Sequence, residues 1–176
     1  RLFAHASNVP LSASWQVLWQ KAKDTLDGSG LIAASITTSG WFRDLLVDSG
    51  FTSEQEIVLL EHRARAMELR PLPSGLILRD MHEDDLPSVI SVDWDGFDRL
   101  WRNSAPALHA GLLQAGFATV AVVDNEIVGY QISTRNSFGA HLARLAVTKK
   151  MQGHGIGYHL VQDLLNKCRM MGLYRI

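Results

Sequence analysis

The residues from His141 to Leu165 limit the possible folds of this chain more than any other stretch. They read HLARLAVTKKMQGHGIGYHLVQDLL, an apolar run followed by a glycine-rich segment and then by a helical pattern. Val161, Leu164, Leu165 and Cys168 recur at the spacing of one helix face, which predicts an amphipathic helix with that face buried. The stretch therefore predicts a strand, a tight turn and a packed helix in direct succession.

The glycines of the turn favour phosphate binding. Gly153, Gly155 and Gly157 have no side chains, so another group can approach the backbone closely at these positions. The helix that follows offers unpaired N–H groups and the positive end of its dipole, which together suit a phosphate group. The spacing G-x-G-x-G is not the dinucleotide fingerprint, and no Gly-Lys-Ser/Thr phosphate loop is present. The phosphate could belong to a coenzyme or to some other nucleotide, and a purely structural turn is a further alternative.

A hairpin precedes this stretch. Residues 118–133 (ATVAVVDNEIVGYQIS) are two apolar runs around Asp124-Asn125, a pair typical of tight hairpin turns. With Leu145-Ala146-Val147 and the run Gln152 to Gly157 (QGHGIG), this order of elements resembles the GNAT acetyltransferase family, whose signature is Q/R-x-x-G-x-G/A. The resemblance covers roughly Leu76 to Ile176.

The resemblance implies a fold, a co-substrate and a set of binding residues. The fold is α/β (α+β), a mixed, mostly antiparallel sheet flanked by helices, and the co-substrate is acetyl-CoA. The fourth strand would hold the thioester and the pantetheine arm, and the amides of the turn would bind the pyrophosphate. The implied binding residues are Leu145, Ala146, Val147, Gln152, Gly153, His154, Gly155, Ile156, Gly157 and Tyr158.

The catalytic groups of the family are only partly matched. Many relatives carry a Glu near the start of the fourth strand, whereas residues 139–144 read GAHLAR. His141 is the nearest titratable group and is our candidate general base, a strand-edge histidine without a catalytic role being the alternative. The usual acid, a Tyr four residues before a Gly-Phe pair, would fall at Leu46. Two functions follow: transfer of an acetyl group to a primary amine of a small molecule or peptide, or a catalytically silent acyl-CoA-binding or scaffold module.

Composition narrows the partners. There are 17 Lys plus Arg against 18 Asp plus Glu, so no global charge favours nucleic acid or a membrane surface. No apolar run approaches the ~20 residues that span a bilayer, and no signal peptide is visible. The lone cysteine, Cys168, excludes a disulfide within the chain, and a cytoplasmic setting fits best. The seven histidines show no metal spacing, so we expect no metal.

Residues 1–70 resemble the back half of a GNAT unit. We predict helices over 11–26 and from Ser39 to Gly50, strands over 31–36 and 56–61, and a linker over 70–75. Gly50-Phe51 matches the pair that ends the last helix of the family, but this half lacks the glycine turn. We therefore expect a structural segment over 1–70 and the acetyl-CoA-binding front half of a GNAT domain over 71–176.

Two arrangements explain the two halves: a fragment of a tandem GNAT protein, or halves that complete one fold by swapping or permutation. Either leaves sheet edges and apolar faces to cover, so we expect a close contact between the half-domains or a homodimer. The acceptor wall would involve residues 94–98 and 100–104 (WDGFD and LWRNS). Trp94, Phe97 and Trp101 are nevertheless expected mainly in the core. An ordinary solvated face is expected for Asp93, Asp95 and Asp98, with attraction of a cationic amine as the alternative.

Overall fold

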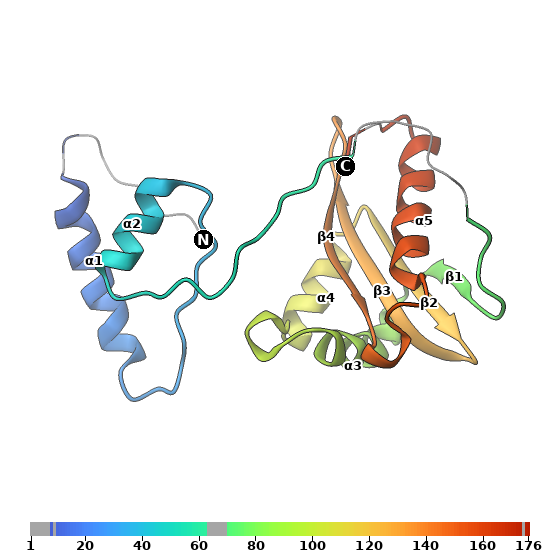
Figure 1. Ribbon diagram of the computed structural model, residues 1–176, viewed down its shortest axis with the longest axis horizontal. Coiled ribbons are helices and arrows are strands. Elements are labelled where there is room, and N and C mark those ends of the chain that lie inside the picture. Colours follow the sequence, from blue (N-terminus) through green and yellow to red (C-terminus); the bar gives the residue numbers. More distant parts are fainter. Residues whose placement is uncertain (1–7, 9, 63–69, 174) are drawn as a thin grey trace. The chain divides into compact units, whose positions relative to one another are not determined.

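The computed structural model describes residues 8, 10–62, 70–173 and 175–176 (Figure 1). Its internal contacts divide the chain into two compact units, residues 1–58 and 59–176.

The first unit contains two helices, α1 (Leu11–Leu26) and α2 (Gly40–Asp48). Aromatic side chains join them: Trp15 stacks on Trp19 at 6.1 Å between ring centroids and meets Phe42 edge-on at 5.8 Å. Gly50 adopts φ 88°, and the N–H groups of Gly50 and Phe51 donate to the carbonyls of Val47 and Leu46. This pattern is the Schellman motif, so the Gly-Phe pair ends α2 as the sequence predicts.

The two strands predicted in this half are wrong. The segments 31–36 and 56–61 have no regular secondary structure, and Ile32 and Leu60 are 76% and 88% exposed. An apolar run of strand-forming residues becomes a strand only when a second strand pairs with its main chain. Among the described residues, neither segment has such a pairing along its length.

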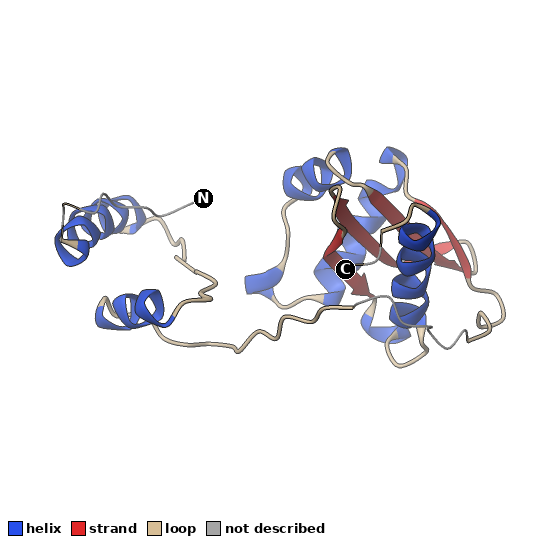
Figure 2. Cartoon of the chain, turned by 90° about the horizontal axis from the view of Figure 1, so that it is seen from above, coloured by secondary structure: helices blue, strands red, loops and turns tan. Residues whose placement is uncertain are grey.

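The second unit is a four-stranded antiparallel sheet in the order β1-β2-β3-β4. Helices α3 and α4 lie against one face and α5 against the other (Figure 2), which confirms the predicted sheet flanked by helices. The elements follow in the order β1 (Ile77–Asp80), α3 (Leu86–Gly96), α4 (Ala105–Leu113), β2 (Phe117–Val123), β3 (Glu126–Arg135), β4 (Ala140–Val147) and α5 (Ile156–Met170). Short 3-10 turns precede α3, α4 and α5 at Glu83–Asp85, Arg99–Trp101 and Lys149–Met151.

The predicted hairpin is confirmed at its turn. Asp124 and Asn125 connect β2 to β3 with φ values of 49° and 65°. Positive φ at both central residues defines the type I′ turn, whose twist matches that of the two strands. Local sequence chemistry is therefore sufficient to fix this part of the sheet.

Each face of the sheet has its own apolar core. On the α3 and α4 side, Val89, Leu108 and Tyr130 are buried together. On the α5 side, Ile156 and Leu160 pack on Ala121. The predicted buried face of α5 is confirmed at Leu164 and Cys168, whereas Val161 and Leu165 are only partly buried. Leu160 and Ile156, one and two turns before Leu164, complete the buried face. This packing fixes the start of α5 against the sheet.

Residues 175–176 form main-chain hydrogen bonds with the start of β4 and with His62. The Ala140 N–H at the start of β4 donates to the Arg175 carbonyl, and His62 and Ile176 exchange N–H···O bonds of 2.7 and 3.1 Å. Such a reciprocal pair is the hydrogen-bonded pairing of antiparallel strands. Arg175 and Glu61 form an ion pair of 2.8 Å beside it.

An ion pair at the start of α3 leads to a pH-dependent prediction. Asp85 accepts two bonds of 2.7 Å from Arg79 and one of 2.8 Å from the His82 N–H. The bonds from Arg79, opposed by partial burial and assisted by His82, lower the pKa of Asp85. We expect Asp85→Asn to cost about 1 kcal/mol at pH 7. Folding lowers the pKa of Asp85, so the difference in free energy of unfolding between the two proteins has its full size above the unfolded pKa of ~4. It shrinks as the pH falls through the folded pKa. Urea unfolding of both proteins between pH 7 and 2 tests it, and a constant difference would contradict the assignment.

Candidate active site

The site begins where β4 ends. Leu145, Ala146 and Val147 lie opposite Gln131, Tyr130 and Gly129 of β3, and the strand stops at Val147 as predicted. A Cβ added at Gly157 would lie 3.7 Å from Leu145 and 3.9 Å from Val147. The first turn of α5 is therefore packed closely on the end of β4. In the described sheet β4 is an edge strand, so half of its main-chain groups point away from β3.

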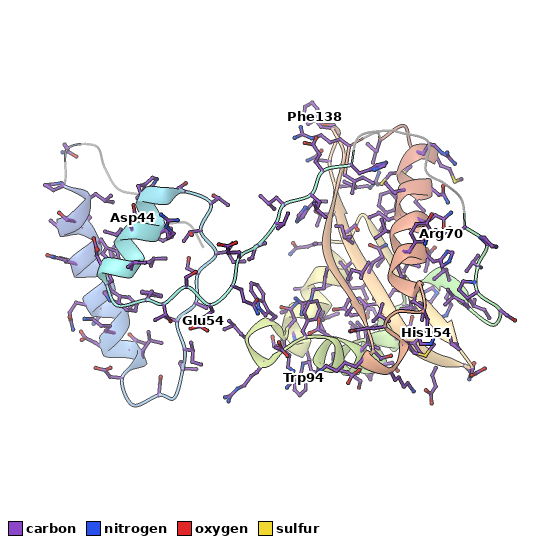
Figure 3. The ribbon with its side chains drawn as sticks, in the orientation of Figure 1. Asp44, Glu54, Arg70, Trp94, Phe138 and His154 are labelled. Atoms are coloured by element: carbon purple, nitrogen blue, oxygen red, sulfur yellow. The ribbon has the colours of Figure 1, made fainter. Side chains whose placement is uncertain are left out.

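The turn between β4 and α5 is open on its outer side. Gly153 and Gly155 adopt φ values of 80° and 79°, and a Cβ added at either would meet no atom within 4 Å. The Gln152 side chain donates to the Val147 carbonyl at 3.1 Å, which ties the turn to the strand. Figure 3 shows His154 at this bend, exposed, with its Nδ1 3.0 Å from the Gln152 carbonyl oxygen. The backbone thus has space in front of it that no described side chain fills.

The same turn presents unused donors. Within the described residues, the main-chain N–H groups of Gly153 to Gly157 have no hydrogen-bond acceptor. They precede the 15-residue helix α5, whose first turn contains no acidic residue. Unpaired N–H groups at the positive end of a helix dipole favour an anion. The Arg70 guanidinium lies 4.8 Å from the centre of the Tyr158 ring and adds a positive charge that the sequence pattern did not reveal.

A β-bulge in β4 determines where His141 lies. Ile132 pairs with Arg144, but the next residue, Ser133, pairs with Leu142, so Ala143 has no partner. Cross-strand partners share a face of the sheet, and His141 pairs with Thr134, two residues beyond Ile132. Ile132 belongs to the core beneath α3 and α4. His141 therefore lies on that same face, as Arg144 does, and its side chain is exposed.

A buried ion pair stands on this face of the sheet. Asp93 of α3 is fully buried and pairs with Arg144 at 2.7 Å. It also accepts hydrogen bonds from the Tyr130 hydroxyl at 2.5 Å and the Asn103 main-chain N–H at 2.9 Å. Burial, followed by the bond to Asp93, raises the pKa of Tyr130, so its hydroxyl stays a donor. The prediction that Asp93 lies on a solvated face is therefore wrong, because the residue is on the side of α3 that faces the sheet.

Among the other acidic and aromatic residues of this region, some are exposed and others pack against the core. Asp95 accepts a bond of 2.6 Å from the Lys149 N–H and so fixes the chain just before the glycine turn. Trp94 is half exposed, contrary to the expected core position, because its Nε1 reaches over the surface to the Asn103 carbonyl at 2.9 Å (Figure 3). Phe97 packs partly against the core, as expected, and Trp101 is half-buried.

The described residues provide neither a metal site nor a membrane-spanning helix. No group of three or more His, Cys, Asp and Glu side chains there is arranged to hold a metal ion. None of the described helices has the length and apolar character that crossing a bilayer requires.

Comparison with known proteins now places the chain in a family. Residues 78–176 match the sequence model of the acetyltransferase (GNAT) family, which is more than half of the chain. The chain belongs to the GNAT family. The matched region includes β2 to α5, so the order of elements that suggested the resemblance is confirmed. A comparison with curated proteins gave no significant match.

Solved GNAT structures share the fold. The ribosomal-protein-S18-alanine N-acetyltransferase of Escherichia coli matches with a TM-score of 0.52 at 15% identity, over 56% of this chain and 62% of its own. Ard1 of Thermoplasma volcanium matches with a TM-score of 0.52 at 18% identity, over 56% and 67%. The PaiA N-acetyltransferase of Thermoplasma acidophilum, solved with coenzyme A, has a TM-score of 0.51 at 15% identity, over 56% and 74%. The chain thus spans less than two thirds of the first of these proteins.

Proposed function

We propose that this chain binds acetyl-CoA at β4 and the glycine turn and transfers the acetyl group to a primary amine. The observation that carries the proposal is the open turn from Gly153 to Gly157, whose N–H groups lack acceptors in the described chain. A pyrophosphate needs such donors, and the left-handed glycines leave room for it. Membership of the GNAT family and the coenzyme A bound to PaiA support the same ligand.

Each binding residue has a separate role in this proposal. The main-chain amides from Gly153 to Tyr158, which include those of His154 and Ile156, hold the pyrophosphate. The outward main chain of Leu145 to Val147 holds the pantetheine arm and the thioester carbonyl. Gln152 borders the pyrophosphate site and also braces the turn through its bond to the Val147 carbonyl.

The chemistry of the step is acyl transfer. Acetyl-CoA supplies an activated acetyl group: the amine nitrogen forms a C–N bond to the carbonyl carbon, the C–S bond breaks and the sulfur leaves as a thiolate. His141, exposed on the face beneath α3 and α4, accepts the proton that the amine loses. The thiolate then takes its proton from solvent.

Domain organisation and setting extend the proposal. Residues 1–70 act as a structural partner without a CoA turn, and residues 71–176 carry the CoA turn and β4, with Arg70 at the boundary beside Tyr158. The bonds between His62 and Ile176 favour completion of the sheet by the N-terminal segment or by that of a second copy. The buried, unpaired Cys168 is consistent with a reducing, cytoplasmic setting.

The competing function is a catalytically silent acyl-CoA-binding module. It is favoured by the lack of a carboxylate in β4, whose sequence is AHLARLAV. Release of CoA thiol from acetyl-CoA separates the two functions, measured with a peptide bearing an N-terminal alanine, a peptide with an internal lysine, spermidine and glucosamine. We expect amine-dependent release with at least one of them. Binding of acetyl-CoA without release for any amine would favour the silent module.

A further inference from the structure

Arg144 connects β4 to the segment between α3 and α4. Its Nη2 donates to the Trp101 carbonyl at 2.5 Å, and its guanidinium lies 3.6 Å from the centre of the Phe97 ring. Its Nε donates to Asp93 at 2.7 Å. One side chain therefore contacts Phe97 and Trp101 of residues 97–103, which we call the 97–103 segment, and holds them against the strand.

Asp93 fixes that side chain and the end of the segment together. Its Oδ2 accepts from Arg144, while its Oδ1 accepts from the Asn103 N–H. The carboxylate is fully buried and the Arg144 side chain is only 15% exposed, so solvent screens this pair weakly. Tyr130 also donates to Asp93, but it belongs to β3 and, in the described chain, forms no hydrogen bond with the segment. Asp93 therefore connects Arg144 and Asn103 of the segment with Tyr130 of the sheet.

The bulge at Ala143 brings this network to the face of the candidate base. Without the unpaired residue, His141 and Arg144 would point to opposite faces of β4. With it they share one face, and the 97–103 segment lies over that face through its bond to Arg144. An amine that reaches His141 from this side therefore passes the segment.

We propose that Arg144 is a positioning residue that holds the 97–103 segment as a wall of the amine site. This inference rests on the proposed acetyl transfer. Arginine is required because its planar fork bonds the carboxylate and the carbonyl at once and stacks on Phe97. Lysine carries the same charge but is a point donor, so it keeps the pair with Asp93 and loses the bridge.

The test compares Arg144→Lys with Tyr130→Phe as the matched control, which removes a donor from the same carboxylate but leaves the Arg144 contacts with Phe97 and Trp101 in place. Steady-state kinetics use acetyl-CoA and the amine of the panel above that turns over fastest. For Arg144→Lys we expect the KM for the amine to rise about tenfold, with kcat and the acetyl-CoA Kd within about threefold of wild type. Tyr130→Phe should leave the amine KM unchanged. An unchanged KM in Arg144→Lys overturns the proposal.

Hydrogen exchange of the Asn103 amide supplies a readout that does not need turnover. Exchange should be about tenfold faster in Arg144→Lys than in wild type and unaltered in Tyr130→Phe. Phe97→Leu, which removes the stacking but not the buried pair, should raise the amine KM by a smaller factor and covers the case in which Arg144→Lys fails to fold. If no amine turns over with the wild type, the proposed function fails, and equal Asn103 exchange in wild type and variants still overturns the inference separately.

Discussion

Replacing Asp93 by alanine should destabilise the second unit by about 3–5 kcal/mol, the usual cost of leaving one member of a buried ion pair alone. The variant removes the acceptor for Arg144, Tyr130 and Asn103 in a place that water does not reach. A domain is stable by only about 5–15 kcal/mol, so the loss is a large share of the total. Urea denaturation measures it, with m-values compared to confirm that the same surface unfolds.

Two comparisons isolate the cause. Asp84→Ala, at an exposed carboxylate of the same unit, should change stability by less than about 0.5 kcal/mol. The double variant Asp93→Ala with Arg144→Met should be less destabilised than the sum of its single variants, because no charge is left buried alone. Additive effects would show that the two residues do not depend on each other.

Replacing His141 by alanine should lower kcat about 100-fold or more, the range expected for loss of a general base. The side chain is exposed on the face shared with Arg144, so its removal leaves no cavity and should not affect folding. The acetyl-CoA Kd should be unchanged, since the proposed pyrophosphate donors lie beyond the other end of β4. The measurement is single-turnover CoA release combined with calorimetric binding.

Thr134→Ala is the matched control, because Thr134 is the exposed cross-strand partner of His141. It should retain kcat within about twofold. If His141→Ala kept kcat within about threefold of wild type, a residue other than His141, or water alone, would be the base.

The parts of this structure that follow from sequence are those fixed by neighbours in the chain. Asp124-Asn125 specify their turn by tolerating positive φ, and Gly50-Phe51 end α2 through bonds to the preceding turn. The glycine turn and the start of α5 follow from the same local rules. Each involves residues that the chain itself brings together, so no distant partner has to be known.

The parts that the sequence does not reveal depend on distant partners. Asp93 and Arg144 are 51 positions apart, and nothing in either segment marks the other as its partner. The bulge at Ala143 has no glycine to indicate it and is visible only in the register with β3. The segments 31–36 and 56–61 have strand composition but no strand beside them, which composition alone cannot tell.

The most direct test of the central claim is titration calorimetry of acetyl-CoA with the whole chain and its Gly155→Asp variant. Gly75→Asp is the matched control, because both glycines have φ 79° and open space around them, so strain and added charge are equal. The account predicts binding by wild type and Gly75→Asp, and at least about 100-fold weaker binding by Gly155→Asp through bulk and repulsion at the pyrophosphate. Absence of binding by the wild type, or equal affinities of the two variants, would contradict a CoA site at the glycine turn.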